Sequence, residues 1–281
     1  MRQDLKYELV GIIPEELIQF IPHSFDIIGG KGDSVAIIEI PLEIENYEKE
    51  IAEALVRVHR NVRSVLSKGT ERRGELRIRN MKFLYGNPNT EVTHRENGYL
   101  IRIDPAKVYF SPRECTEREN VAKFVQSNED VLVMFSGAGP YAVCIAKRNP
   151  SVSVTAVELS PFGNKFCEEN IKLNKLVGRV KAIQGDVRDV CPIMGQIFDR
   201  VFMPLPKGAY LFLDVALRAL KPGGALHFYH WSPRGELFEA AEKILIEAVK
   251  AEHRSAEILN KVKVSQYSPS TWKIRLDARI F

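Results

Sequence analysis

Cysteine is scarce in this chain, and its four copies are far apart. Cys115, Cys144, Cys167 and Cys191 form neither a Cys-x-x-Cys pair nor a cluster with histidine. A zinc site, or any other metal site of familiar spacing, is therefore not expected. Cys144 and Cys167 fall on apolar helical stripes, where we expect them to be core thiols.

Long hydrophobic runs and a strong charge excess are missing as well. No stretch has the length of a membrane-spanning helix, and the start of the chain lacks a signal-peptide pattern. We therefore expect a cytoplasmic protein with no membrane partner. The 40 basic and 36 acidic residues give a net charge of only +4. That excess permits a nucleic-acid partner, but a solvated surface of mixed charge explains it equally well.

The two parts of the chain have different patterns. The first part mixes short strands and helices, with a helical stripe at 47–59 and a hairpin at 91–104 that turns at Asn97-Gly98. A polar helix is expected at 114–127. From Val131 onward strands and helices alternate, which is typical of a doubly wound α/β sheet. We predict an N-terminal α+β domain at 1–104 and a Rossmann-like α/β domain at 105–281.

The stretch from Val131 to Glu158 carries the clearest signal. It predicts a buried strand, a turn of small residues (Ser136, Gly137, Ala138, Gly139), a helix that begins at Pro140, and a second strand that ends on an acid. Small residues and a helix N-terminus let a ligand approach the backbone, and the acid can accept hydrogen bonds from ribose hydroxyls. The stretch therefore predicts a nucleoside-cofactor site, and both NAD and S-adenosylmethionine fit it.

Two further strand ends help to choose between these cofactors, because ligands of open α/β sheets bind outside the carboxyl ends of the strands. Asp186 and Val187 follow the third strand, and Pro204-Leu205-Pro206 follows the fourth. Alone, Glu158 could be an acid at a helix N-terminus and Asp186 a helix cap. Together with a predicted final strand pair at 256–264 and 271–280, they favour S-adenosylmethionine over NAD.

A basic segment lies between the predicted strands of the first part. Lysines and arginines recur through it with two glycines between them, at Lys68, Arg72, Arg73, Arg77, Arg79 and Lys82. It is either a solvated loop or a surface that contacts phosphates, because guanidinium groups pair well with phosphate oxygens.

Nine segments together resemble one family over nearly the whole chain. They are VHRNV at 58–62, KGTERRGELRIR at 68–79, HRENG at 94–98, AKVYFSPRECTERENVA at 106–122, MFSGAGPY at 134–141, ENIKLNKL at 169–176, GDVRDV at 185–190, MPLPKGAYLFLD at 203–214 and GGALHFYHW at 223–231. The chain resembles the archaeal and eukaryotic tRNA guanine-37 N1-methyltransferases. A sister family, the wybutosine-pathway aminocarboxypropyltransferases, shares the fold and cofactor but transfers another group to a modified guanosine at the same tRNA position.

Some positions favour one of these families over the other. Ser111-Pro112-Arg113 and Gly139-Pro140 are similar to the methyltransferases. Pro204 stands where that family has an asparagine that helps to hold the base, and Trp272 is similar to the sister family. Many methyltransferases also have an extra N-terminal module, for which this chain is too short.

The resemblance implies specific roles. Glu117 would be the general base that removes the N1 proton of guanine, Arg77 would stabilise the charge on O6, and Arg113 would order the loop and the phosphates. The implied cofactor is S-adenosyl-L-methionine, the partner is the anticodon loop of tRNA at guanosine 37, and the protein would act as a monomer without a metal. The residues implied to bind the cofactor are Arg118, Phe135, Ser136, Gly137, Ala138, Gly139, Pro140, Glu158, Leu159, Asp186, Val187, Pro204, Leu205 and Pro206.

Three other readings remain open. The enzyme could act elsewhere in the wybutosine pathway, by aminocarboxypropyl transfer to a tricyclic guanosine derivative or by methylation of one. The chain could also bind tRNA without catalysis. Without the resemblance, Glu117 and Arg118 would be read as a surface ion pair on a helix, which contributes little.

Overall fold

The computed structural model describes residues 4–30, 32–73 and 78–281, and it describes residues 70–73 and 78–80 by their backbone alone. The chain forms two compact units, Met1–Cys115 and Thr116–Phe281, called here the first and the second unit. Arg77, the residue expected to contact guanine O6, lies outside the described residues.

The first unit is built on a four-stranded sheet of order β1-β2-β3-β4. β2 and β3 are parallel, so a crossover must join them, and η2 and α2 supply it. Ile51 and Leu55 of α2 share a buried core with Ala36, Ile38 and Val65 of the sheet. The elements are α1 (Leu5–Glu8), η1 (Glu15–Phe20), β1 (Asp26–Gly30), β2 (Asp33–Ile38), η2 (Leu42–Tyr47), α2 (Glu48–Val58), β3 (Val62–Arg73) and β4 (Ile78–Gly86).

A separate hairpin, β5 (Val92–Glu96) and β6 (Tyr99–Ile103), packs beside β1. Asn97 and Gly98 both have positive φ, at 44° and 84°. This is the backbone of the tight turn that the Asn-Gly pair predicts. The short η3 (Pro112–Glu114) ends the first unit.

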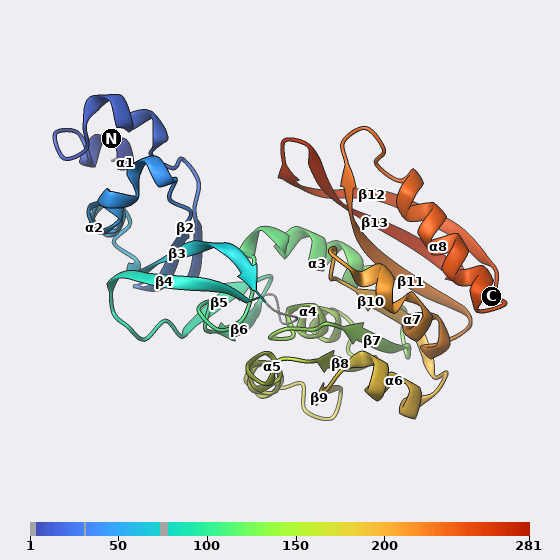
Figure 1. Ribbon diagram of the computed structural model, residues 1–281. Helices are drawn as coiled ribbons and strands as arrows, with labels where there is room; N and C mark the ends of the chain where they lie inside the picture. The colour runs from blue at the N-terminus through green and yellow to red at the C-terminus, as the bar shows by residue number, and fades with distance from the viewer. Residues whose placement is uncertain (1–3, 31, 74–77) are drawn as a thin grey trace. The chain divides into compact units, whose positions relative to one another are not determined.

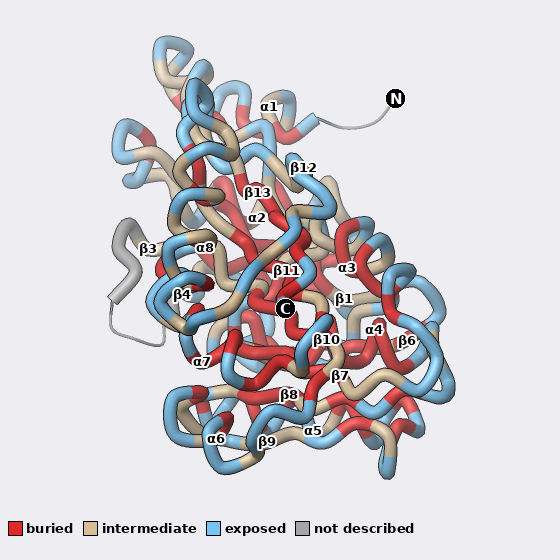
Figure 2. The backbone as a smooth tube through the Cα atoms, turned by 90° about the vertical axis from the view of Figure 1, so that its right-hand side faces the viewer, coloured by how far each residue is buried: buried red, intermediate tan, exposed pale blue. Residues whose placement is uncertain are grey.

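The second unit is a seven-stranded sheet of order β12-β13-β11-β10-β7-β8-β9. β7 to β11 are parallel to one another. β13 pairs antiparallel with β11, and β12 pairs antiparallel with β13. The central strands are buried (Figure 2) because helices cover both faces, which explains their continuous apolar runs. The strands are β7 (Asp130–Met134), β8 (Ser153–Glu158), β9 (Val180–Gln184), β10 (Phe198–Met203), β11 (Leu220–Pro233), β12 (Ala256–Ser268) and β13 (Thr271–Ile280).

Two groups of helices flank this sheet (Figure 1). α4 packs against α5 and α3, and α7 packs between α6 and α8 beside an apolar core that includes Leu276 and Ala278 of β13. The helices are α3 (Cys115–Ala122), α4 (Pro140–Arg148), α5 (Pro161–Leu173), α6 (Val187–Met194), η4 (Ala209–Phe212), α7 (Leu213–Ala219) and α8 (Glu239–Ala251). The Rossmann-like prediction is confirmed, and Cys144 and Cys167 are buried as predicted.

Several boundaries differ from the prediction. The helix expected at 114–127 ends at Ala122. α6 was not predicted, because Pro192 interrupts its helical pattern. The helix nevertheless forms, with Asp186 as its N-cap and the proline at its sixth position. β3 extends to Arg73, so part of the basic segment is a strand and not a loop.

Candidate active site

The turn after β7 has the backbone that its small residues predict. Gly137 and Gly139 have φ of 56° and 78°, and Phe135 takes φ of 55° although it is not glycine. Such a residue costs on the order of 1 kcal/mol or more, and strain of this kind gathers at functional sites. A side chain at Gly139 would also bring its Cβ within 2.5 Å of Cys167 Sγ. Glycine is therefore required at position 139, both for its backbone conformation and because Cys167 fills the space of a side chain.

Glu158 ends β8 and bridges this turn to the next helix. Its Oε2 accepts a hydrogen bond from the Gly137 amide at 2.7 Å, and its Oε1 accepts one from the Ser160 amide at 2.8 Å. Burial raises the pKa of Glu158, against the opposing effect of these backbone donors. Because a carboxylate offers about four acceptor positions, Glu158 can still accept hydrogen bonds from a ligand.

Asp186 caps the N-terminus of α6, which was the alternative to a cofactor contact at this position. It accepts hydrogen bonds from the Arg188 amide at 2.8 Å and from the Arg188 side chain. The hydrogen bond from the Arg188 side chain is the largest influence that lowers the pKa of Asp186. The Arg188 guanidinium lies 5.3 Å from the ring centre of Phe212, which in turn meets Phe135 edge-on at 5.0 Å. The third strand end is thus joined to the first, while the Val187 side chain lies in the core.

The fourth strand end is the segment from Pro204 to Pro206. The Leu205 amide donates to Met203 O at 2.8 Å, and Pro206 O accepts from the Trp231 amide at 3.1 Å. Pro204 has no N–H and an apolar side chain, so it cannot donate a hydrogen bond to a base as an asparagine would. The carboxyl edge of β7, β8, β9 and β10 therefore gathers the four predicted strand ends of one domain.

Glu117 lies on α3 and is only 8% exposed. Its Oε1 accepts a hydrogen bond of 2.6 Å from the Tyr229 hydroxyl and a second one from Arg275 Nη1. Arg118, the next residue, is 1% exposed. The alternative of a surface Glu117–Arg118 pair is therefore wrong.

The remaining predicted residues lie in the first unit. Arg113 is exposed on η3 and forms an ion pair of 2.6 Å with Asp26. Two lysines of the basic segment are also paired, Lys68 with Asp26 at 3.6 Å and Lys82 with Glu48 at 2.5 Å. Their charges are partly neutralised in this structure.

Sequence reasoning missed the partners of Glu117. Arg275 and Asp277 alternate with apolar residues along β13, and this alternation normally marks a strand with one solvated face. Here the polar face is buried as well. β13 is an inner strand of the sheet, between β12 and β11. Because helices cover both faces of this sheet, polar residues on an inner strand could have been expected to be buried.

Among the described residues, no group of three or more His, Cys, Asp and Glu side chains is placed to hold a metal ion. In the same part of the chain, every helix is too short or too polar to reach across a bilayer.

Known proteins match both units. The family model described as the TRM5/TYW2 methyltransferase domain matches residues 92–262, and the one described as the TYW2 N-terminal domain matches residues 5–90. The tRNA (guanine(37)-N(1))-methyltransferase Trm5b of Pyrococcus abyssi is 40% identical, over 99% of this chain and 81% of that protein. The tRNA(Phe) (4-demethylwyosine(37)-C(7)) aminocarboxypropyltransferase of Pyrococcus horikoshii is 34% identical, over 96% of this chain and 93% of that protein.

Solved structures agree with these matches. The complex of aTrm5 with tRNALeu superposes with a TM-score of 0.86 at 32% identity, and covers 100% of this chain and 79% of that one. P. horikoshii TYW2 in complex with MeSAdo superposes with a TM-score of 0.83 at 31% identity, and covers 100% and 99% of the two chains.

Proposed function

The chain belongs to the TRM5/TYW2 methyltransferase family, and we propose that it transfers the methyl group of S-adenosylmethionine to N1 of guanosine 37 in the tRNA anticodon loop. The observation that carries this proposal is the similarity to Trm5b, which extends over 99% of the chain and hence over both units. The Ser111-Pro112-Arg113 segment and the Gly139-Pro140 step add to it.

The described residues fit this cofactor. The glycine turn at Gly137 to Gly139 leads into the start of α4, and Glu158 keeps acceptor positions for ribose hydroxyls. We propose that Arg118, Leu159, Asp186 and the segment from Pro204 to Pro206 complete the site. For Asp186 this requires that it share its carboxylate between Arg188 and the ligand, or release Arg188.

The chemistry needs a proton acceptor, since N1 of guanine carries a proton at neutral pH. Glu117 accepts that proton, and the N1 lone pair then forms the new bond to carbon. S-adenosylmethionine supplies the electrophilic methyl on a sulfonium, and the carbon–sulfur bond breaks as the nitrogen–carbon bond forms. We assign Arg77 to the negative charge on O6 and Arg113 to ordering the loop and the phosphates.

The first unit is proposed to contact tRNA. The basic segment from Lys68 to Lys82 would bind phosphates, which requires that Lys68 and Lys82 exchange their carboxylate partners for phosphate oxygens. We expect the protein to act as a monomer in the cytoplasm.

Two observations favour a second candidate, aminocarboxypropyl transfer at the same position. The N-terminal residues 5–90 match the TYW2 N-terminal domain, and Pro204 removes the hydrogen-bonding side chain that a guanine-binding asparagine would supply.

Substitution of the target nucleoside tests the first function. An unmodified tRNA with guanosine 37 should accept labelled methyl, and the same tRNA with adenosine 37 should accept none. Equal incorporation into both would overturn the proposed acceptor.

A further inference from the structure

The carboxylate of Glu117 is held from one side only. Tyr229 of β11 and Arg275 of β13 both donate to Oε1, and within the described residues no side chain or amide is recorded as donating to Oε2. The two donors therefore fix the position of Oε1 and leave Oε2 as the oxygen that can accept a proton.

Arg275 is itself fixed by Asp277, two residues along the same face of β13. Arg275 Nε donates to Oδ1 at 2.7 Å and Nη2 donates to Oδ2 at 3.2 Å, and both side chains are almost fully buried. Burial opposes the ionisation of Asp277, but the hydrogen bonds from His227 and Arg275 outweigh it, so the pKa of Asp277 lies below its usual range. This two-point pairing fixes the plane of the guanidinium.

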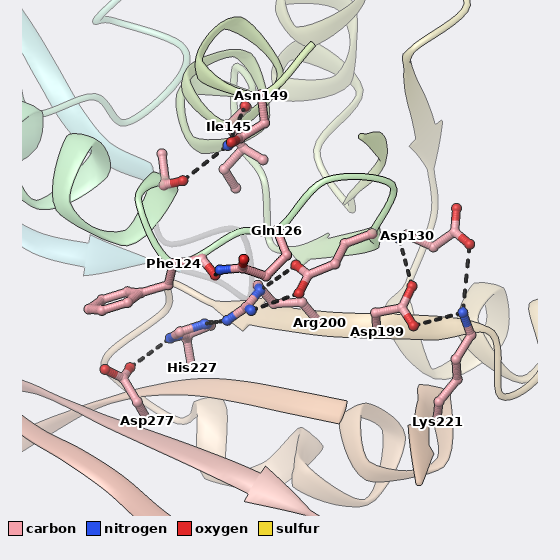
Figure 3. Close-up of polar contacts among 12 residues, drawn as sticks. Phe124, Gln126, Asp130, Ile145, Asn149, Asp199, Arg200, Lys221, His227 and Asp277 are labelled. Atoms are coloured by element: carbon pink, nitrogen blue, oxygen red, sulfur yellow. Dashed lines mark hydrogen bonds and ion pairs between the residues drawn. The ribbon is translucent and has the colours of Figure 1, made fainter. Parts of the chain in front are cut away.

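His227 of β11 holds Asp277 in turn (Figure 3). Its Nδ1 lies 2.6 Å from Asp277 Oδ1, and its Nε2 lies 2.8 Å from Arg200 Nη1. A guanidinium can only donate, so Nε2 must accept, and the proton is on Nδ1, where it donates to Asp277. The imidazole is therefore neutral, and burial lowers the pKa of His227 to about 4.

The far end of this line is closed by Arg200 and Glu129. Arg200 binds the Glu129 carboxylate through two hydrogen bonds of 2.7 and 2.8 Å. The His227 ring stacks on Phe202 at 4.2 Å with an angle of 6° between the planes, and on Phe124 at 6.0 Å. The ring can thus neither rotate nor shift without losing its hydrogen bonds and its aromatic contacts.

These six residues, called here the buried network, form one continuous line across three neighbouring strands to α3: Glu129, Arg200, His227, Asp277, Arg275 and Glu117. Buried ion pairs are weak devices for stability, because apolar residues of similar volume often stabilise a core as well or better. Stability alone therefore does not account for the network. Its contact with Glu117, the proposed general base, indicates a role in the reaction.

We propose that Asp277 and His227 are positioning residues for proton abstraction, which act by orienting Arg275 so that it holds Oε1 of Glu117 and leaves Oε2 to the substrate. This inference rests on the proposed function, in which Glu117 removes the N1 proton. In the step, the N1–H bond breaks and the proton passes to Oε2. The N1 electron pair forms the bond to the methyl carbon while the bond from that carbon to sulfur breaks, and its electron pair stays on sulfur.

Two variants test the proposal in the full chain with its tRNA substrate. Asp277→Asn keeps the volume but removes the charge that fixes Arg275, and Tyr229→Phe removes a single hydroxyl with little risk to folding. Each should lower the single-turnover rate by roughly 10- to 100-fold, as expected for a misplaced reacting group. The dissociation constants for cofactor and tRNA should stay within about twofold of wild type, since neither residue is assigned to binding them. Lys221→Gln, which alters the pairs of Lys221 with Asp199 and Asp130 outside the buried network, is the matched control.

The split between rate and binding separates positioning from a structural role. A variant that only loosens the fold should weaken cofactor and tRNA binding together with the rate, whereas a misplaced carboxylate should lower the rate alone.

A double-mutant comparison completes the test. If Asp277 acts through Glu117, Asp277→Asn should lower the residual rate of Glu117→Gln no further. Wild-type rates in Asp277→Asn and Tyr229→Phe, or a full additional loss in the double variant, would overturn the inference. Methyl transfer by the wild-type protein would in that case leave the proposed function intact. No methyl transfer by the wild-type protein would overturn both.

Discussion

Gly163 lies directly beneath Glu158: a Cβ at Gly163 would be 2.8 Å from Glu158 Cγ. Gly163 is in the first turn of α5, where its φ is ordinary, so glycine is needed here for space and not for backbone freedom. The absent side chain lets Glu158 hold the turn after β7 and face the proposed cofactor.

The first prediction concerns this contact. Gly163→Ala should displace Glu158 and weaken S-adenosylmethionine binding by about tenfold, on the order of one lost hydrogen bond to a charged group. Isothermal titration calorimetry measures the dissociation constant. Gly235→Ala, whose Cβ would meet open space, should leave it unchanged. If both variants bind the cofactor as wild type does, Glu158 is not a ribose ligand.

The second prediction concerns Glu117. Glu117→Gln keeps the shape of the side chain but cannot accept the N1 proton, so single-turnover methylation should fall by roughly 100- to 10,000-fold. Cofactor affinity should change little. Glu119→Gln on the same helix, which alters the contacts of Glu119 with Arg148 and Cys144, is the control. A normal rate in Glu117→Gln would remove the general-base assignment.

The third prediction concerns acid stability. The pKa of His227 is about 4 in the folded chain and near 6.5 when unfolded. Below pH 6.5 the unfolded state therefore binds a proton that the folded state does not, and stability is lost as the pH falls from 6.5 towards 4. The loss should reach roughly 3 kcal/mol.

Urea denaturation of wild type and His227→Phe at pH 7.5 and 4.5 measures this loss in the free energy of unfolding. The phenylalanine variant should be less stable at pH 7.5, because Asp277 and Arg200 lose their partner. It should lose less stability on acidification than wild type. An equal loss in both proteins would contradict the assignment of a neutral, buried His227.

The fourth prediction concerns tRNA binding by the basic segment. Phosphate contacts release counterions, so tRNA affinity should fall steeply with salt, and the slope of log K against log salt should shrink by about one for each phosphate contact removed. Arg72→Ala with Arg73→Ala should reduce the slope, whereas Arg218→Ala, which breaks an exposed pair with Glu252, should not. A slope near zero in wild type would contradict phosphate binding.

The sequence predicts those parts of the molecule that follow from local rules. The turn from Ser136 to Gly139 and the helix start at Pro140 could be predicted because small residues and proline restrict the backbone directly. The hairpin at Asn97-Gly98 follows from the same kind of rule. α6 escaped prediction because Pro192 hides its period, and a cap at Asp186 was considered only as the alternative to a cofactor contact.

The burial of polar residues could not be predicted in this way. Glu117 was selected through a family resemblance, since its own helix is polar and reads as a surface element. Its partner Arg275 is 158 positions away, and no local pattern joins two such residues. The alternation along β13 indicated a solvated face, but packing in the second unit buries it.

The most direct test of the account identifies the group that the chain transfers. The wild-type protein would be given S-adenosylmethionine labelled separately on the methyl carbon and on the aminocarboxypropyl chain, once with unmodified tRNA and once with tRNA that carries 4-demethylwyosine at position 37. Digestion to nucleosides then shows which label arrives and on which base. The account predicts methyl label on N1 of guanosine 37 in the unmodified tRNA. Aminocarboxypropyl label on the tricyclic base, with no methyl on guanosine 37, would contradict it.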